Sequence, residues 1–474
     1  MVFRKRKGSR QSNIARVEIK KDMSQYSRRK FLGLGAAAAG ASLASRTFLL
    51  NPEPLWASQA AAAGERIRFG MIGIGMQGSG LLTDSIELPG IECVAACDLY
   101  DGRHTLAREI TQEVTGKGNL PVTRRYHELL DNKNIDCLVA AVPDHWHKQV
   151  VIDAVNAGKD IYCEKPMSHT AADGVAMVEA AQKSGRIVQI GSQRVSSLIC
   201  KKAKELIAQG TIGDLVLVEG WLGRNDPTGA WEYPPPLDLS PENLDWDTWQ
   251  GTAPKKAFDP YAFARWRCWK EYGTGVAGDL LVHLISGMMF MLGINEPPKQ
   301  AMSVGGILRW KDGRNMPDVQ ATVYYYGQLP VYMRLNLGTE MPETYRLQGS
   351  KGILEVNEFG LNYTPQSGKD AAPSYYAAGF PKEMRTAYEK QWHEKNDPKI
   401  GHEPMPESIS YRGPDYDDMK PHLWTFFQAV KSRQPVVEDA VFGHHAALAC
   451  HMANESYFRQ KPVWWDEASK TIKS

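Results

Sequence analysis

The stretch "RIRFGMIGIGMQG", residues 66–78, is an apolar segment that runs into the pattern Gly73-x-Gly75-x-x-Gly78. Glycine at these positions permits a tight turn, a close approach of the backbone to a pyrophosphate, and contact between a helix and a strand. A helix that begins here directs its N-terminal amides at the phosphates. The pattern therefore predicts a dinucleotide-binding site, with a glycine turn in an unrelated α/β protein as the alternative.

A second apolar segment, "IECVAACD" (91–98), ends in Asp98. A carboxylate at this distance from the glycines can accept hydrogen bonds from both hydroxyls of the adenosine ribose, and it would repel a 2′-phosphate. The sequence thus favours NAD over NADP as the cofactor. Arg103 lies nearby and keeps NADP open as the alternative.

Apolar strand-like segments and amphipathic helix-like segments alternate after this point. The strands are expected at 135–143, 160–166 and 186–194, with helices between them. This alternation predicts a parallel, doubly wound sheet. β-rich segments follow at 214–222, 301–310, 319–326, 331–337 and 344–356, and helical periodicity returns over 421–460. The fold class is therefore α/β, with a second domain rich in strands.

The N-terminal 60 residues differ from the rest in composition. "SRRKFLGLG" (27–35) pairs Arg28 with Arg29 ahead of a short, weakly apolar run, which resembles a bacterial twin-arginine signal. The resemblance implies passage through the twin-arginine translocase and a periplasmic or secreted location, and a basic disordered tail is the alternative. No other segment approaches the ~18 apolar residues of a membrane helix, so we expect no integral membrane segment in the mature chain.

Charge and cysteine content exclude further classes. Residues 61–474 hold 44 Lys and Arg against 51 Asp and Glu, a balance that argues against a nucleic-acid binder. The seven cysteines are scattered, and none shows the C-x-x-C spacing of a zinc site. We therefore expect no structural disulfide and no metal.

Three motifs in order resemble a known family. They are the glycine-rich segment at 66–78, "AAVPDHWHKQVVIDAVNAGKDIYCEKP" (140–166) and "GTGVAGDLLVHLISG" (273–287). Together they are similar to the glucose-fructose oxidoreductase, inositol dehydrogenase and MocA-like (Gfo/Idh/MocA) family, over roughly residues 66–360. The resemblance implies a Rossmann domain, then an α+β domain with an open, mainly antiparallel sheet, and a nicotinamide bound between them.

The expected organisation follows from these segments. We expect a signal and linker over 1–60, an NAD-binding domain over 61–195, a substrate and oligomerisation domain over 196–440 with a Trp-rich insertion at 221–272, and a C-terminal helix and tail over 441–474. Members of the family commonly assemble through the face of the open sheet, which implies a homodimer or homotetramer.

Lys165, Asp279 and His283 are the catalytic candidates. Lys165 follows a strand of the doubly wound sheet, where ligands of such sheets bind, although a surface lysine at a strand end is the alternative. Asp279 and His283 are four residues apart and share a helix face. The resemblance implies that the lysine contacts the reacting hydroxyl, the histidine accepts its proton, and the aspartate holds a neighbouring hydroxyl. A metal half-site and a structural ion pair remain alternatives, and Ser286 stands where many relatives have a second aspartate.

The remaining candidates surround these three. Cofactor-binding residues are expected at Gly73, Gly75, Met76, Gln77, Gly78, Asp98, Pro143, Asp144, His147, Glu164, Lys165 and Gln193. Substrate-binding residues are expected at Arg194, Arg267 and Trp269. The other aromatic residues of the insertion either stack on sugar rings or fasten a long loop to the body.

The function expected from these features is NAD(P)-dependent oxidation of a CH–OH group in a sugar, sugar derivative or polyol. An exported enzyme cannot replace a lost nucleotide, so the cofactor would be tightly held and recycled in place. The alternatives are a glycoside hydrolase or lyase that oxidises the sugar ring transiently, and a sugar-binding protein without catalysis.

Overall fold

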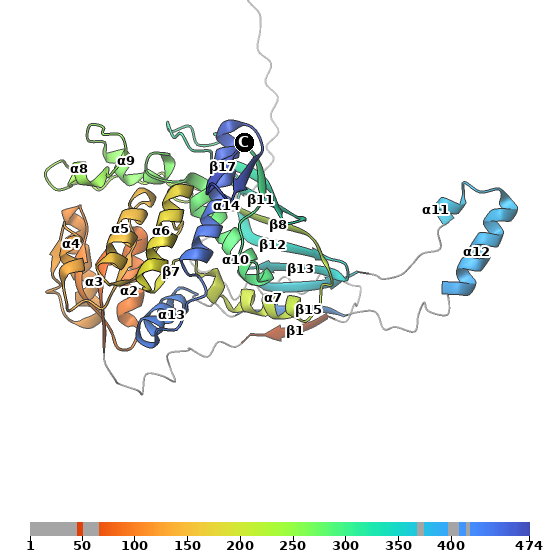
Figure 1. Ribbon diagram of the computed structural model, residues 1–474, viewed down its shortest axis with the longest axis horizontal. Helices are drawn as coiled ribbons and strands as arrows, with labels where there is room; N and C mark the ends of the chain where they lie inside the picture. Colours follow the sequence, from red (N-terminus) through yellow and green to blue (C-terminus); the bar gives the residue numbers. More distant parts are fainter. Residues whose placement is uncertain (1–44, 51–65, 367–373, 397–406, 414–417) are drawn as a thin grey trace, which may run out of the picture. The chain divides into compact units, whose positions relative to one another are not determined.

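The computed structural model describes residues 45–50, 66–366, 374–396, 407–413 and 418–474 (Figure 1). The twin-arginine pattern and the apolar run after it lie outside the described residues. None of the helices in the described part of the chain is long and apolar enough to cross a membrane.

The N-terminal domain is a six-stranded sheet in the order β4-β3-β2-β5-β6-β7, and all of its pairings are parallel. The strands are almost fully buried, as expected of a sheet covered on both faces. Their bounds are β2 (Ile67–Ile72), β3 (Ile91–Cys97), β4 (Val122–Thr123), β5 (Cys137–Ala140), β6 (Asp160–Cys163) and β7 (Val188–Ile190). The model thus confirms the predicted doubly wound sheet.

Helices cover both faces of this sheet. Side chains alternate along each strand, so Phe69 and Met71 pack with α2 (Met76–Glu87), whereas Ile72 packs with α5 (Asp144–Asn156). α3 (Asp101–Thr115), α4 (His127–Asp131) and α6 (Ala171–Ser184) complete the two layers. α6 shows how local sequence sets the helix ends: Thr170 accepts a hydrogen bond from the Asp173 amide, and Gly185 ends the helix in the left-handed conformation.

The second sheet has eleven strands in the order β1-β15-β14-β13-β12-β8-β11-β10-β9-β16-β17. It is mainly antiparallel, with parallel pairing only at β1–β15 and β8–β11. The bounds are β1 (Ser45–Leu49), β8 (Leu215–Gly223), β9 (Gln300–Gly306), β10 (Val319–Tyr326), β11 (Leu329–Asn336), β12 (Met341–Gly349), β13 (Gly352–Asn357), β14 (Gly360–Pro365), β15 (Ser408–Arg412), β16 (Val463–Asp466) and β17 (Thr471–Lys473). The predicted α/β fold with an open antiparallel sheet is confirmed.

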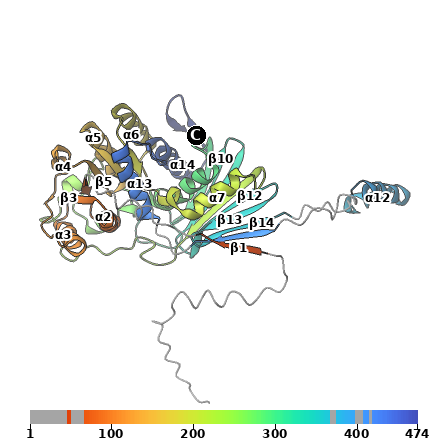
Figure 2. The same ribbon diagram turned by 90° about the horizontal axis from the view of Figure 1, so that it is seen from below.

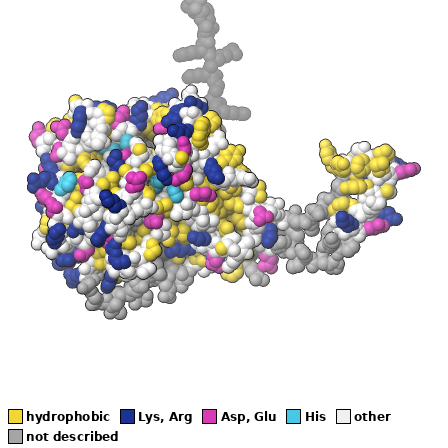
Figure 3. Space-filling view, viewed as in Figure 1, with side chains coloured by type: hydrophobic (Ala, Val, Ile, Leu, Met, Phe, Trp, Pro, Cys, Tyr) yellow, Lys and Arg dark blue, Asp and Glu magenta, His cyan; other side chains and the backbone are white. Residues whose placement is uncertain are grey.

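One face of the second sheet is covered, and the other is open. α7 (Leu198–Ala208) and α10 (Val282–Leu292) lie over the covered face (Figure 2). On the open face, Met302 and Val304 of β9 and Val323 and Tyr325 of β10 are exposed neighbours. Figure 3 shows apolar side chains gathered on the side of the molecule where this sheet lies.

The C-terminal part of the chain returns to the first domain. α13 (Met419–Ser432) places Leu423, Phe426 and Phe427 in the apolar core that contains Phe69. α14 (Ala440–Arg459) contributes to the cores of both domains. The domain boundaries expected at residues 195 and 440 assign α13 to the second domain, whereas its apolar side chains pack in the core of the first.

Two other parts of the chain complete the description. β1 lies within the stretch expected to be signal and linker, and it pairs with β15, where Phe48 stacks on Tyr411. The segment between β14 and β15 contains α11 (Ser374–Ala377) and α12 (Lys382–Asn396). Sequence periodicity alone did not indicate β1, because a five-residue edge strand carries little pattern.

Candidate functional site

The glycine loop after β2 meets the steric requirements of a dinucleotide cradle. Gly73 has φ of +84°, and a Cβ atom there would lie 2.5 Å from the Ala141 carbonyl oxygen. A Cβ atom at Gly78 would overlap the Gly73 carbonyl oxygen. α2 begins with no side-chain cap and no acidic residue in its first turn. Its amides therefore fit an anionic ligand such as a pyrophosphate.

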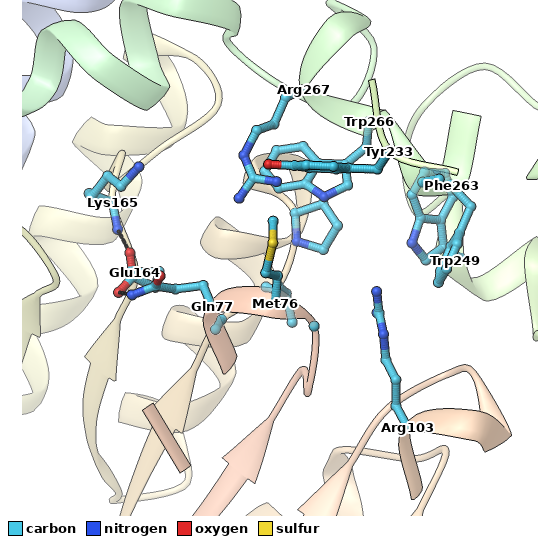
Figure 4. A pocket seen from close by; sticks show the side chains of 15 residues that line it. Met76, Gln77, Arg103, Glu164, Lys165, Tyr233, Trp249, Phe263, Trp266 and Arg267 are labelled. Atoms are coloured by element: carbon cyan, nitrogen blue, oxygen red, sulfur yellow. Dashed lines mark hydrogen bonds between the residues drawn. The ribbon is translucent and has the colours of Figure 1, made fainter. Parts of the chain in front are cut away.

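Two adjoining pockets run from this loop. The first is lined by Gly75, Met76, Gln77, Glu164 and Lys165 on one side, and by Tyr233, Trp249, Phe263, Trp266 and Arg267 on the other (Figure 4). The second lies over Asp98, Leu99, Tyr126 and Trp146. Arg103, Ala141, Val142, Pro143 and Trp249 line both pockets, so the two form one groove along the ends of the strands.

Asp98 lies in the second pocket at the end of β3. Its Oδ2 accepts a hydrogen bond from the Ile74 amide at 2.8 Å, and its Oδ1 accepts one from the Tyr100 amide at 3.0 Å. Arg103 Nη1 lies 3.4 Å from Asp98 Oδ2, and the guanidinium group lies over the Phe263 ring, 4.8 Å from its centre. The Asp98 carboxylate, which favours NAD, and the Arg103 guanidinium group, which would favour NADP, thus lie at the same end of the groove.

Lys165 and Asp279 are in direct contact at the other end. Lys165 Nζ donates to Asp279 Oδ1 and to the Asp279 carbonyl oxygen, both at 2.9 Å. Arg267 Nε donates to the same Oδ1 at 3.0 Å. Burial alone would raise the pKa of Asp279, but the charges of Lys165 and Arg267 outweigh it and hold this pKa well below its usual range. The aspartate is therefore ionised and holds both cations.

The helix that carries Asp279 is not regular. Residues Ala277–Leu281 form a π turn, and α10 continues from Val282. Such turns are rare and are frequent at functional sites. The Asp279 carbonyl oxygen that accepts from Lys165 Nζ lies within this turn.

His283 follows in the first turn of α10. Burial lowers its pKa well below the usual value, and the charges of Lys165 and Arg194 add to this effect. Its Nδ1 atom is buried with no hydrogen-bond partner among the described residues. The imidazole is therefore neutral at ordinary pH and able to accept a proton. It does not line either pocket.

Arg194 belongs to a partly buried ion cluster beside His283. Its Nε and Nη2 donate to Glu343 at 2.8 and 2.7 Å, and its Nη1 donates to Asp418 at 3.0 Å. The Tyr345 hydroxyl donates to the His283 carbonyl oxygen at 2.9 Å and contacts Glu343 at 3.0 Å. These contacts fix the backbone at His283, and the expected substrate contact of Arg194 stays a prediction.

Glu164 lies at the base of the first pocket. Its Oε1 accepts from Gln77 Nε2 and its Oε2 from the Lys165 amide, both at 3.1 Å. Burial raises its pKa to about 7, more than the Lys165 charge and the Gln77 hydrogen bond lower it. The side chain therefore exchanges a proton close to neutral pH.

This pKa makes the stability of the nucleotide-free protein depend on pH. Folded Glu164 keeps its proton up to about pH 7, whereas the unfolded side chain loses it near pH 4.5. The stabilisation is complete below pH 4.5 and is lost as pH rises through 7. We expect the unfolding free energy to fall by about 3 kcal/mol more across this range in the parent than in Glu164→Gln. Chemical denaturation at several pH values measures this, and parallel curves would contradict it.

Four expected site residues do not line either pocket. Asp144 Oδ2 accepts from the Thr274 amide and hydroxyl, at 2.9 and 2.6 Å. The ring nitrogens of His147 contact the carbonyl oxygens of Pro166 and Val142. Both side chains brace the loops after β5 and β6 and do not line the groove. Gln193 and Trp269 also lie outside the lining of both pockets, and each has a buried polar atom without a partner among the described residues.

Several groove residues had no assigned role in the sequence predictions. Trp249 lines the groove, whereas its aromatic character suggested sugar stacking and loop packing equally. Phe263 also lines the groove and was not singled out from the sequence. Glu343 and Tyr345, outside the groove, lie far from His283 in the sequence and belong to no motif. Glu343 could have been inferred only from the need of the Arg194 guanidinium group for an acidic partner.

The described residues contain no group of three His, Cys, Asp or Glu side chains that could hold a metal ion. The ring nitrogens of His145 contact the carbonyl oxygens of Tyr272 and Trp249 at 3.1 and 2.9 Å. Each of the seven cysteines is a buried free thiol.

Comparison with known proteins supports the family resemblance over the first domain. Residues 67–192 match the model of the GFO_IDH_MocA family, an oxidoreductase family with an NAD-binding Rossmann fold. Inositol 2-dehydrogenase of Salmonella typhimurium is 35% identical over 156 residues, which are 32% of this chain and 45% of that protein. A glycosyl hydrolase family 109 protein of Stenotrophomonas maltophilia is 27% identical over 203 residues, 41% of each protein. The chain thus spans about half the length of the curated relatives it matches.

Solved structures extend the likeness to both domains. A levoglucosan dehydrogenase in complex with NADH and levoglucosan aligns with a TM-score of 0.58 and 18% identity, covering 84% of this chain and 99% of that one. At this identity the likeness shows the shared fold.

Proposed function

We propose that this protein is an NAD(P)-dependent oxidoreductase that acts on a CH–OH group of a sugar, sugar derivative or polyol. The observation that carries the proposal is the position of Lys165. Its ammonium group lies in a dinucleotide groove, held by the ionised Asp279 and close to the neutral imidazole of His283. The partial match to inositol 2-dehydrogenase supports the substrate class.

The residues divide the chemistry between them. A bound nicotinamide supplies the acceptor for the hydride that leaves the substrate carbon. Lys165 Nζ donates a hydrogen bond to the substrate oxygen and stabilises the negative charge that develops on it. His283 accepts the hydroxyl proton, because its pKa keeps the ring neutral. Asp279 holds Lys165 in place, Arg267 binds the same carboxylate of Asp279, and Tyr345 fixes the backbone at His283.

Asp98 is the basis for proposing NAD over NADP. Asp98→Asn removes the negative charge and keeps an oxygen for the Ile74 amide. We expect the preference for NAD to fall by about tenfold, because the repulsion of a 2′-phosphate is lost and Arg103 is released to bind it. Titration of both nucleotides by fluorescence measures the ratio. Asp98→Asn with Arg103→Ala should lose the gain in NADP binding, and an unchanged ratio in Asp98→Asn would contradict the assignment.

We further propose that the protein is exported with its nucleotide bound, as a dimer or tetramer formed through the open sheet. The arginine pair at 28–29 and the exposed apolar face of β9 and β10 support these parts of the proposal. Native mass spectrometry of the protein as isolated would report bound nucleotide and assembly together. A protein isolated empty, with freely exchanging nucleotide, would contradict retention.

The partial match to a glycosyl hydrolase family 109 protein favours one second candidate. The same groove would then oxidise a glycoside transiently, which acidifies a neighbouring C–H bond and permits the leaving group to depart. Nitrophenyl glycosides separate the two candidates. Release of nitrophenol without net NADH formation would support glycoside cleavage, and NADH formation or hydride transfer to a second sugar would support the oxidoreductase.

A further inference from the structure

Residues 238–272, which we call the aromatic strap, form a small core of their own. The strap includes α8 (Trp246–Trp249) and α9 (Pro260–Ala264). Leu244, Trp246, Trp249, Phe263 and Tyr272 are buried together. Tyr100 from the dinucleotide domain belongs to the same core, so the strap packs on that domain rather than on the second sheet alone.

The first fastening of the strap lies at the adenosine end of the groove. Tyr100 and Leu244 form an antiparallel β-bridge. The Asp245 amide donates to the Leu99 carbonyl oxygen at 3.1 Å, and the Asp101 amide donates to the Asn243 carbonyl oxygen at 3.0 Å. The Tyr100 hydroxyl also hydrogen-bonds Asp238.

The second fastening explains the sequence Asp144-His145-Trp146-His147. Trp146 Nε1 donates to the Trp249 carbonyl oxygen at 2.9 Å, and His145 Nε2 contacts the same oxygen at 2.9 Å. The His145 amide donates to the Tyr272 carbonyl oxygen at 3.3 Å. The motif therefore ties the first turn of α5 to the strap at Trp249 and at Tyr272.

Between the two fastenings, the strap forms one wall of the groove. Trp249 lines both pockets, and Phe263 and Trp266 line the first. Figure 4 shows Trp249 and Phe263 beyond Arg103, across the pocket from Met76 and Gln77 of the phosphate loop. These aromatic side chains thus face the dinucleotide end of the groove, and Arg267 reaches the Lys165 end through its contact with Asp279.

We propose that the aromatic strap is the outer wall of the nucleotide site, and that it must detach from these fastenings before NAD(P) enters or leaves. This inference rests on the proposed function, and it assigns Trp249, Thr248 and Phe263 to cofactor binding. A groove covered in this way releases its nucleotide slowly, because release requires local opening of a packed aromatic core. The strap would therefore keep one nucleotide in the site over many turnovers.

A reversible crosslink tests the proposal. Tyr100 and Leu244 are a non-hydrogen-bonded antiparallel pair, because the backbone hydrogen bonds join the residues on either side of them. The Cα atoms of such a pair are about 4.5 Å apart, a separation that a disulfide can span. The double variant Tyr100→Cys/Leu244→Cys is loaded with NADH or NADPH, whichever the parent retains. Release into excess oxidised nucleotide is followed by nicotinamide fluorescence, with and without reductant. The seven natural cysteines are buried, so thiol counting reports the introduced pair.

We expect the oxidised form to release nucleotide at least about tenfold more slowly than the same protein after reduction. Equal rates in the two forms would overturn the proposal while leaving the proposed function intact. Failure of the disulfide to form would contradict the bridge and overturn the proposal as well. Absence of nucleotide binding in the parent would contradict both the proposal and the proposed function.

A second variant does not depend on a crosslink. Trp249→Ala removes the side chain that lines both pockets, and we expect about tenfold faster release with bound nucleotide still detectable. Trp464→Ala, at a half-exposed tryptophan on β16, is the matched control and should release at the parent rate. Unchanged release from folded Trp249→Ala would overturn the proposal.

Discussion

Replacement of Lys165 by methionine should reduce turnover by about 10² to 10⁴-fold, while the bound nucleotide is retained. Methionine keeps much of the side-chain volume but removes the donor to the substrate oxygen. The nucleotide remains because its phosphates bind the glycine loop and the start of α2, which Lys165 does not support. Steady-state rates on the best substrate from a sugar and polyol screen, together with the absorbance of the retained nucleotide, measure the two effects.

Two further variants sharpen this test. Lys165→Arg keeps the positive charge but changes the position of the donor, so it should also be slow if geometry matters. Lys431→Met, at an exposed lysine on α13, is the control for loss of one charge and should keep the parent rate. A Lys165→Met variant with parent activity would exclude the catalytic role assigned to Lys165.

Replacement of Asp279 by alanine should destabilise the protein by about 3–5 kcal/mol and abolish most of the activity. The carboxylate is the shared acceptor of Lys165 Nζ and Arg267 Nε, and its side chain is 14% exposed. Its removal leaves two cations close together in a site with little water. Chemical denaturation measures the loss, and Asp214→Ala, at an exposed aspartate ahead of β8, should unfold as the parent does.

A double-mutant cycle separates the charge cluster from simple packing. In Asp279→Ala with Lys165→Met, one of the two cations is absent, so the loss of stability should be smaller than the sum of the single variants. Additive losses would contradict a direct ion pair between these side chains. Recovery of stability without recovery of activity would agree with the assigned roles.

The two sheets were largely predictable from local patterns. Gly73 and Gly78 mark the phosphate loop because a Cβ atom at either position would overlap the backbone. The buried strands of a parallel sheet are continuous apolar runs. The return of α13 was not predictable in the same way. Phe426 and Phe427 read as one side of an amphipathic helix, and nothing local indicates that their partner is Phe69, more than 300 residues earlier.

The site was predictable where chemistry depends on sequence spacing. Lys165 follows a strand, and Asp279 and His283 share one helical segment. The sequence could therefore locate the lysine and the Asp/His pair. The π turn at Ala277–Leu281 could not, because a single altered turn leaves no periodic signal. The partners of Arg194 and the position of Trp249 over the groove depend on tertiary packing, and spacing carries no information about either.

The position of α13 also limits the order in which a nascent chain can fold. The sheet that binds the nucleotide lacks part of its apolar cover until Leu423, Phe426 and Phe427 have left the ribosome. Biogenesis of the cofactor pocket is therefore a late event, which follows translation of the strands that surround it by more than 200 codons.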